Sequence, residues 1–145
     1  MFQNIMVAVG PSPWSRNAVN AAIRLSAALH QNLLIAHILE DDPQFQAAEI
    51  DPSDPQMREQ IEATGNDILQ QAAARAQQSQ VACRTISEWG SIPDQIVRIA
   101  QVSSCDLIVM GTRHLTGDKR LMTGRICNAV LATAPCPVLV VPLLQ

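Results

Sequence analysis

The chain has 145 residues, of which 48% are hydrophobic and 16% are charged, and its formal net charge at pH 7 is −3. This length and composition indicate one globular domain, residues 1–145, and exclude a disordered chain. The negative charge and the 3% aromatic content argue against nucleic-acid binding. No apolar run approaches the roughly 18 residues of a membrane helix. The first expected strand starts near Ile5, which leaves no room for a signal peptide, so we expect a cytoplasmic protein without membrane contact.

The first half of the sequence predicts two buried strands on either side of an amphipathic helix. Residues 5–9 and 33–39 are short apolar runs, which suit strands buried on both faces of a parallel sheet. Ser12 followed by Pro13 is typical of a helix start, and apolar residues then recur at helical spacing at Trp14, Ala18, Ala22, Leu25 and Leu29. Residues 40–55 are acidic, carry three prolines and predict an exposed loop.

The second half repeats the alternation of helices and strands. Asp54 and Pro55 start a long helix, whose apolar positions are Met57, Ile61, Ile68, Leu69 and Ala76. Residues 81–87 have the mixed polarity of a strand near a sheet edge. Ser91 and Asp94 resemble a capping box before a helix whose apolar stripe is Ile92, Ile96, Ile99 and Ala100. Residues 107–110, 126–132 and 138–141 then read as strand, helix and strand.

Five strands that alternate with helices are typical of a doubly wound α/β domain with a mostly parallel sheet and helices on both faces. We expect the strand order 3-2-1-4-5. In such sheets, ligands bind beyond the carboxyl ends of the strands, where the strand order reverses. The residues at those ends are Val9-Gly10, His37-Ile38 and Met110-Gly111.

A basic loop is expected to lie over the same edge of the sheet. Gly111 and Gly124 bracket a segment that carries Arg113, His114, Lys119 and Arg120, with Arg125 just beyond it. Gly124 precedes a helix, and the unpaired N–H groups and dipole of a helix start favour an anion. The segment therefore indicates a phosphate or other anion site. The alternative is a solvated loop whose arginines pair with the acidic segment 40–54.

The cysteines and the remaining histidines have ordinary structural interpretations. Cysteines 83, 105, 127 and 136 have neither Cys-x-x-Cys spacing nor zinc-finger spacing to a histidine. We interpret them as small buried apolar residues in a reducing compartment, and expect no metal site. His37 lies within an apolar strand, which favours a hydrogen-bonded core histidine over a site residue. His114 is either a ligand contact or pH-sensitive group, or an exposed loop histidine.

The sequence resembles the universal stress protein family over essentially its whole length. The resemblance rests on Val-Met-Gly-Thr-Arg at 109–113, Lys-Arg-Leu-Met at 119–122, Gly124, and the run Ala-Val-Leu-Ala-Thr-Ala-Pro-Cys-Pro-Val-Leu-Val-Val at 129–141. The opening Ile-Met-Val-Ala-Val, the following Pro-Ser, and Trp-Gly-Ser-Ile-Pro at 89–93 are similar to other landmarks of the family. Nucleotide-binding members carry Gly-x2-Gly-x9-Gly followed by Ser or Thr, and an aspartate at the end of the first strand.

Three positions depart from that nucleotide-binding pattern. Gly111 and Gly124 have the family spacing, but His114 replaces the middle glycine, Arg125 the Ser or Thr, and Gly10 the aspartate. A histidine crowds a backbone that must approach phosphate closely, whereas an arginine can still contact an anion from further away. Loss of a buried aspartate anchor costs roughly 1–3 kcal/mol. We therefore expect weakened or lost ATP binding, with an anion or AMP still possible and no obligatory cofactor. The expected contact residues are Val9, Gly10, Ile38, Met110, Gly111, Arg113, His114, Gly124, Arg125 and Ile126.

The last strand predicts a self-association surface. Val138 to Val141 is apolar on both faces, and an exposed apolar edge strand readily pairs with another chain. Pro137 and Pro142 shorten the part of the strand that can form hydrogen bonds with another chain, but they do not cover it. The family resemblance implies an antiparallel homodimer through this strand, with the interface residues Pro137, Val138, Leu139, Val140, Val141 and Pro142.

Three functions compete on these observations. The favoured hypothesis is a non-catalytic, dimeric stress-response protein with a degenerate nucleotide site and an unknown protein partner. The first alternative is a nucleotide sensor for ATP, AMP or cyclic AMP, or a weak nucleotide hydrolase, that uses the same loop. A hydrolase needs a carboxylate to hold a metal, and Asp118 or the acids at 40–42 are the nearby candidates. The second alternative, a phospho-receiver, needs an acidic pair after the first strand and an aspartate after the third. Gly10-Pro11 and Glu88-Trp89 do not supply those groups convincingly.

Overall fold

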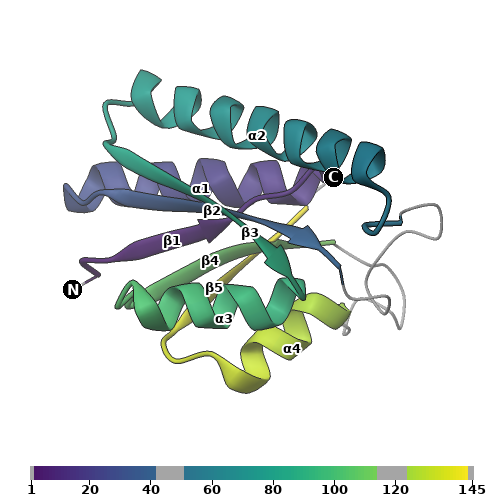
Figure 1. Ribbon diagram of the computed structural model, residues 1–145. Coiled ribbons are helices and arrows are strands. Elements are labelled where there is room, and N and C mark those ends of the chain that lie inside the picture. The colour runs from purple at the N-terminus through teal and green to yellow at the C-terminus, as the bar shows by residue number, and fades with distance from the viewer. Residues whose placement is uncertain (1, 42–50, 114–123, 144–145) are drawn as a thin grey trace.

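The computed structural model describes residues 2–41, 51–113 and 124–143, in which strands and helices alternate along the chain (Figure 1). The elements in chain order are β1 (Ile5–Ala8), α1 (Pro13–Leu29), β2 (Leu33–Glu40), α2 (Pro55–Gln78), β3 (Cys83–Gly90), α3 (Ile92–Val102), β4 (Leu107–Thr112), α4 (Arg125–Thr133) and β5 (Val138–Pro142).

The five strands form one parallel sheet in the order β3-β2-β1-β4-β5, which confirms the predicted doubly wound topology. β1 lies at the centre, with Ile5 beside Leu33 of β2 on one side and beside Leu107 of β4 on the other. The strand order reverses between β1 and β4. The carboxyl ends of β1, β2 and β4 therefore meet at one edge, where a doubly wound sheet binds its ligands.

Helices cover both faces of the sheet, as Figure 1 shows. α1 and α2 cover one face, where residues such as Val19, Ile35 and Leu69 form one hydrophobic cluster. α3 and α4 cover the other face, where residues such as Met6 and Ile99 form a second cluster. This two-sided burial explains why the central strands are continuously apolar in sequence. In the described part of the chain, no helix combines the length and the hydropathy needed to cross a membrane.

Two of the three expected helix caps form as the sequence predicts. The Ser12 hydroxyl accepts a hydrogen bond from the Ser15 N–H at 3.3 Å, and the Asp54 carboxylate accepts one from the Gln56 N–H at 3.0 Å. The predicted capping box at Ser91 does not form, because the Ser91 side chain makes no cap hydrogen bond. The Glu40 carboxylate, at the end of β2, accepts a hydrogen bond from the first N–H of α3 instead.

The edge strands lie where the sequence places them, with shifted limits. β3 is an edge strand as expected but runs over 83–90 rather than 81–87, because it pairs with the whole length of β2. β5 forms the opposite edge, and its Leu139 side chain is 40% exposed. The interpretation of the cysteines needs correction, because Cys127 is buried whereas Cys83, Cys105 and Cys136 are partly exposed.

Candidate functional site at the carboxyl ends of the strands

A cleft of about 630 Å³ opens at the edge where the carboxyl ends of β1, β2 and β4 meet. This volume is typical of a small-molecule site. Six of the ten residues predicted from sequence line it, namely Val9, Gly10, Ile38, Met110, Gly111 and Ile126. Three strand ends and the start of α4 supply those six residues, so the structure brings this part of the predicted set together at one cleft.

The end of β1 contributes a glycine with room around it. Apart from its chain neighbours, a methyl group added at Gly10 would meet no atom of the described residues within 4 Å. The Gly10 N–H donates a hydrogen bond of 2.6 Å to the Ser15 hydroxyl, which belongs to the first turn of α1. The backbone here is therefore held by Ser15, while a Cβ at position 10 would contact none of the described residues outside its chain neighbours.

His37 on β2 is a hydrogen-bonded buried histidine, as the sequence predicts, and it also lines the cleft. Its Nδ1 lies 2.7 Å from the Val9 carbonyl oxygen. Because a carbonyl can only accept, Nδ1 carries the proton, and in the neutral ring Nε2 is left as an acceptor. Burial lowers the pKa of His37, and the hydrogen bond to Val9 opposes that effect only in part. The ring is therefore neutral at pH 7.

Gly111 is needed for packing between β4 and α1. A methyl group at this position would lie 2.2 Å from the carbonyl oxygen of Trp14 and 2.6 Å from its carbonyl carbon. These are backbone atoms of the first helical turn, so they cannot turn aside as a side chain would. The glycine of the family motif thus brings β4 against the start of α1 and holds Trp14 at the wall of the cleft.

The outer wall of the cleft is the N-terminal part of α2, which the sequence analysis predicted as a helix with an apolar stripe but did not connect with a site. Its Met57, Ile61 and Ile68 side chains are half-buried and line the cleft, together with Gln60 and Thr64. The signal that could have revealed this wall is the polar composition of α2. A helix with so few apolar positions covers a sheet incompletely and leaves some of them facing a cavity.

Close packing holds this wall against the sheet. A methyl group at Gly65 of α2 would lie 2.7 Å from Cδ2 of His37, so the glycine allows the helix to approach the imidazole closely. Beyond it, the Arg58 guanidinium lies 3.9 Å from the ring centroid of Trp89, and the Trp89 indole N–H donates to Glu62 at 2.8 Å. These contacts connect the start of α2 to the end of β3.

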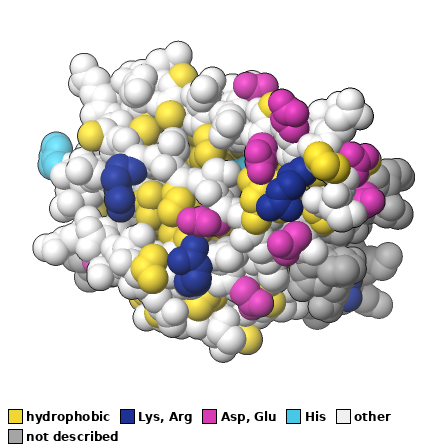
Figure 2. Space-filling view, viewed as in Figure 1, with side chains coloured by type: hydrophobic (Ala, Val, Ile, Leu, Met, Phe, Trp, Pro, Cys, Tyr) yellow, Lys and Arg dark blue, Asp and Glu magenta, His cyan; other side chains and the backbone are white. Residues whose placement is uncertain are grey.

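The rim of the cleft is acidic on the side of β2 and α3. The Glu40 carboxylate at the end of β2 accepts a hydrogen bond of 2.9 Å from the Ile92 N–H, the first residue of α3. It thereby takes the capping role that the sequence gave to Ser91, and it fills the anion-favouring start of α3. Figure 2 shows the face of the molecule seen in Figure 1, and most acidic side chains on it lie in the half that covers the carboxyl ends of the strands.

The predicted anion loop is only partly described by the structure. Gly124 is the N-cap of α4 with φ of 87°, which a glycine adopts without strain. Arg113 and Arg125 are exposed and lie outside the set of residues that line the cleft, as does Gly124. His114, Lys119 and Arg120 fall outside the described residues. Among the described residues, no group of three or more His, Cys, Asp or Glu side chains is placed to hold a metal ion.

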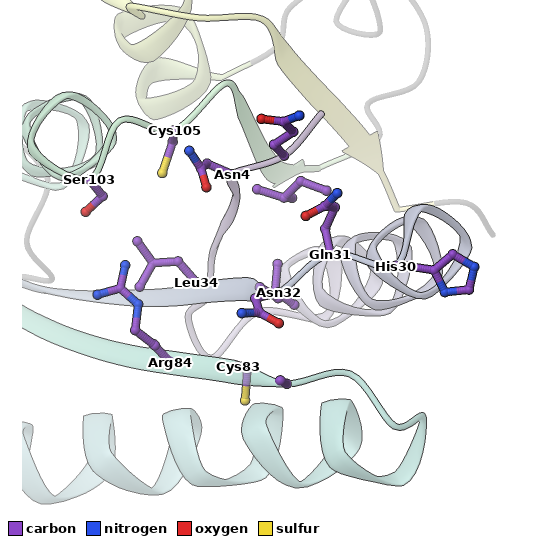
Figure 3. A pocket seen from close by; sticks show the side chains of 13 residues that line it. Asn4, His30, Gln31, Asn32, Leu34, Cys83, Arg84, Ser103 and Cys105 are labelled. Atoms are coloured by element: carbon purple, nitrogen blue, oxygen red, sulfur yellow. The ribbon is translucent and has the colours of Figure 1, made fainter. Parts of the chain in front are cut away.

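A second cleft, of about 450 Å³, opens at the opposite edge, where the amino ends of the strands lie (Figure 3). Its walls come from the start of β1, the α1–β2 connection, the start of β3 and the α3–β4 connection. Polar side chains dominate its lining, including Asn4, Gln31, Asn32 and Arg84. Sequence reasoning did not find this cleft, because surface amides carry no distinguishing pattern.

Comparison with known proteins agrees with the geometry. The chain matches the universal stress protein family over residues 1–142. It is 28% identical to the universal stress protein YxiE of Bacillus subtilis, with 97% of this chain and 99% of that protein covered. The solved structure of UspA from Lactobacillus plantarum superposes with a TM-score of 0.77 at 24% identity, covering 97% of each chain. A universal stress protein solved in complex with cAMP superposes with a TM-score of 0.73 at 23% identity, also covering 97% of each. With its doubly wound sheet, its cleft at the strand ends and this whole-length match, the chain belongs to the universal stress protein family.

Proposed function

We propose that this protein is a non-catalytic, homodimeric binding protein of the stress response, whose cleft is a degenerate adenine-nucleotide site. The cleft provides an apolar lining for a flat base, with Val9, Ile38 and Met110 on the sheet and Ile61 on α2. A related protein of the same fold is known in complex with cAMP. The retained cleft supports binding of a small nucleotide, and the altered anchors predict that this binding is weak.

Gly10 is the observation that carries the proposal. Family members that bind nucleotide place an aspartate at this strand end, and here the position is a glycine, with no described atom within 4 Å of where its Cβ would lie. A carboxylate that accepts from a ligand hydroxyl or amine in a buried site contributes roughly 1–3 kcal/mol. Its loss weakens binding by about 5- to 150-fold at an otherwise unchanged site.

The charges around the cleft favour a ligand with few phosphates. Glu40 lines the cleft and already occupies the start of α3, so a highly charged triphosphate meets repulsion on that side. The start of α4, whose Ile126 lines the cleft, offers a positive environment on the other side, and the exposed Arg125 precedes Ile126 outside the lining. Cyclic AMP or AMP therefore suits this cleft better than ATP does.

The test is isothermal titration of purified, nucleotide-stripped protein with ATP, ADP, AMP and cyclic AMP in parallel. The proposal predicts that AMP or cyclic AMP binds more tightly than ATP, and that ATP does not reach micromolar affinity. Stoichiometric ATP binding at micromolar affinity would contradict it. Release of phosphate from ATP or AMP during the same incubation, at a rate that scales with protein concentration, would favour the weak hydrolase instead.

The homodimer is proposed through β5. This strand is the sheet edge next to β4, its sequence is apolar, and Leu139 is 40% exposed on it. A charge at this position should oppose antiparallel pairing with a second copy. We expect Leu139→Lys to convert a dimer into a monomer in sedimentation velocity. The matched control is Val102→Lys on α3, which replaces a side chain that is 67% exposed away from β5 and should leave the dimer intact. A wild-type protein that stays monomeric at high concentration would refute this part of the proposal.

A further inference from the structure

The long helix α2 has two parts that are held to the rest of the molecule in different ways. Its residues in the hydrophobic cluster on this face of the sheet all lie in the second part, namely Ile68, Leu69, Ala72, Ala73 and Ala76. Gly65 is the first buried residue of the helix, and none of the residues 55–64 is buried. The first part, residues 55–64, instead forms the outer wall of the cleft at the carboxyl ends of the strands. Apolar burial therefore fixes the second part of α2 to the sheet, but not the first.

Trp89 provides a fixed point beside that wall. It lies near the end of β3, where it is paired with Leu39 of β2 in the sheet. Its carbonyl oxygen accepts a hydrogen bond of 3.0 Å from Nε2 of Gln95, which belongs to α3. The Trp89 backbone is thus held by a neighbouring strand and by a helix on the other face of the sheet. Its side chain can therefore anchor an element that is itself less firmly held.

The Trp89 indole contacts two side chains that lie one turn apart on the first part of α2. The Arg58 guanidinium lies 3.9 Å from the centroid of the indole ring, which makes a cation–π contact. The indole N–H donates a hydrogen bond of 2.8 Å to Oε1 of Glu62. Nε of Arg58 lies 3.8 Å from the same oxygen, so the three side chains form one connected group. We call Arg58, Glu62 and Trp89 the Trp89 clamp.

We propose that Trp89 is a positioning residue for the cleft, which holds the first part of α2 in place through Arg58 and Glu62. Trp89 lies outside the lining that the described residues give the cleft, so it acts through the helix rather than by touching a ligand. A segment with few buried apolar contacts opens locally at a low free-energy cost. Loss of the clamp should therefore increase the population in which residues 55–64 lie away from the sheet, while the second part of α2 stays in place.

The two contacts of the indole set the size of the expected effect. The side chains of Arg58 and Glu62 are 44% and 48% exposed, so solvent screens their interactions and keeps each contribution small. Together, a cation–π contact and a hydrogen bond to a carboxylate should change the opening equilibrium by about 5- to 30-fold.

Amide hydrogen exchange of the full-length protein, followed by NMR, measures this opening without any ligand. The amides of residues 59–64 donate within the first part of α2, and those of residues 66–78 report on the second part. Trp89→Leu removes both the aromatic face and the indole N–H. In this variant, exchange should become about 5- to 30-fold faster at residues 59–64 and stay unchanged at residues 66–78.

Arg58→Ala replaces an exposed side chain, so it carries the same test if Trp89→Leu destabilises the whole fold. Because the two residues share one contact, the double variant should exchange little faster than Trp89→Leu alone. The matched control is Glu88→Gln, at the neighbouring position of β3, because Glu88 lies 3.5 Å from Arg98 of α3. This control should leave the exchange of α2 unchanged.

Three results of the exchange experiment would overturn the proposal. The first is amides at residues 59–64 that are already unprotected in the wild type. The second is unchanged exchange at these residues in Arg58→Ala. The third is an equal increase across both parts of α2 in Arg58→Ala, because that would show general destabilisation rather than local opening.

The effect on binding rests on the proposed nucleotide site and has its own readout. AMP should dissociate about 5- to 30-fold faster from Trp89→Leu than from the wild type in surface plasmon resonance, because the wall opens more often while the lining residues are unchanged. Equal dissociation rates, together with faster exchange at residues 59–64, would overturn the role of Trp89 in binding. Absence of AMP binding to the wild type would count against the nucleotide site, and the exchange experiment would then decide on the clamp by itself.

Discussion

Replacement of Gly111 by alanine tests whether this family-motif glycine is a packing residue. The added methyl group would lie 2.2 Å from the Trp14 carbonyl oxygen, roughly 1 Å short of normal contact. The Trp14 carbonyl carbon and the Ser15 nitrogen would also be too close, at 2.6 and 3.0 Å. All three are backbone atoms in the first turn of α1, so the clash is relieved only if α1 and β4 move apart.

The expected cost follows from that geometry. Overpacking that forces backbone shifts costs about 1–3 kcal/mol. Alanine also restricts the unfolded chain, which offsets about 0.4–1 kcal/mol of that cost. We therefore expect Gly111→Ala to lower the free energy of unfolding by about 1–2 kcal/mol, and to displace Trp14 from the cleft wall.

The assay is urea unfolding followed by circular dichroism, with Gly10→Ala as the matched control. A methyl group at Gly10 meets no atom within 4 Å, so this control should be neutral or stabilising by about 0.4–1 kcal/mol. Both glycines lie at the ends of neighbouring strands and line the same cleft. A Gly111→Ala variant as stable as the Gly10→Ala variant would refute the close approach of β4 and α1.

Two further predictions concern stability. The Ser26 hydroxyl is fully buried without a hydrogen-bond partner among the described residues, so Ser26→Ala should raise the free energy of unfolding by about 1 kcal/mol. Ser15→Ala removes the acceptor for the Gly10 N–H and should lower the free energy of unfolding by about the same amount. Both changes are measured by the same urea titration. His37 has a lowered pKa in the fold, so below its ordinary pKa of about 6.5 the unfolded chain binds the proton first, and stability should fall with pH until the folded-state pKa is reached. Unfolding midpoints measured from pH 8 to pH 5 should show this decrease, and a His37→Gln variant should lose that component; an unchanged slope would contradict a buried neutral His37.

The sequence predicts the fold well because its signals are local. The apolar runs of β1 and β2, and the proline after each N-cap at Ser12 and Asp54, are read directly from neighbouring residues. The cap of α3 could not be predicted in this way. Its acceptor is Glu40, which lies 52 residues before Ile92 in the chain and reaches it only through the pairing of β2 with β3.

The candidate site likewise contains residues that local sequence signals predict and residues that depend on long-range contacts. Positions at the strand ends, such as Gly10 and Met110, were predicted because topology alone brings strand ends together. The wall formed by Met57 and Ile61 was missed, because periodicity shows that a helix face is apolar without showing whether it meets the sheet or a cavity. The packing role of Gly111 could not be predicted from the sequence either, because the Trp14 backbone that it contacts is nearly a hundred residues away along the chain.

The most direct test of the degenerate-site account restores the missing carboxylate. A Cβ at position 10 meets no described atom within 4 Å, so we expect Gly10→Asp to fold, and Gly10→Ala controls for the added bulk without the charge. Isothermal titration with AMP and cyclic AMP should show affinity about 5- to 150-fold higher for Gly10→Asp than for wild type, with Gly10→Ala unchanged. Equal binding by Gly10→Asp and Gly10→Ala would show that the cleft does not hold a nucleotide in the family manner, and would contradict the account.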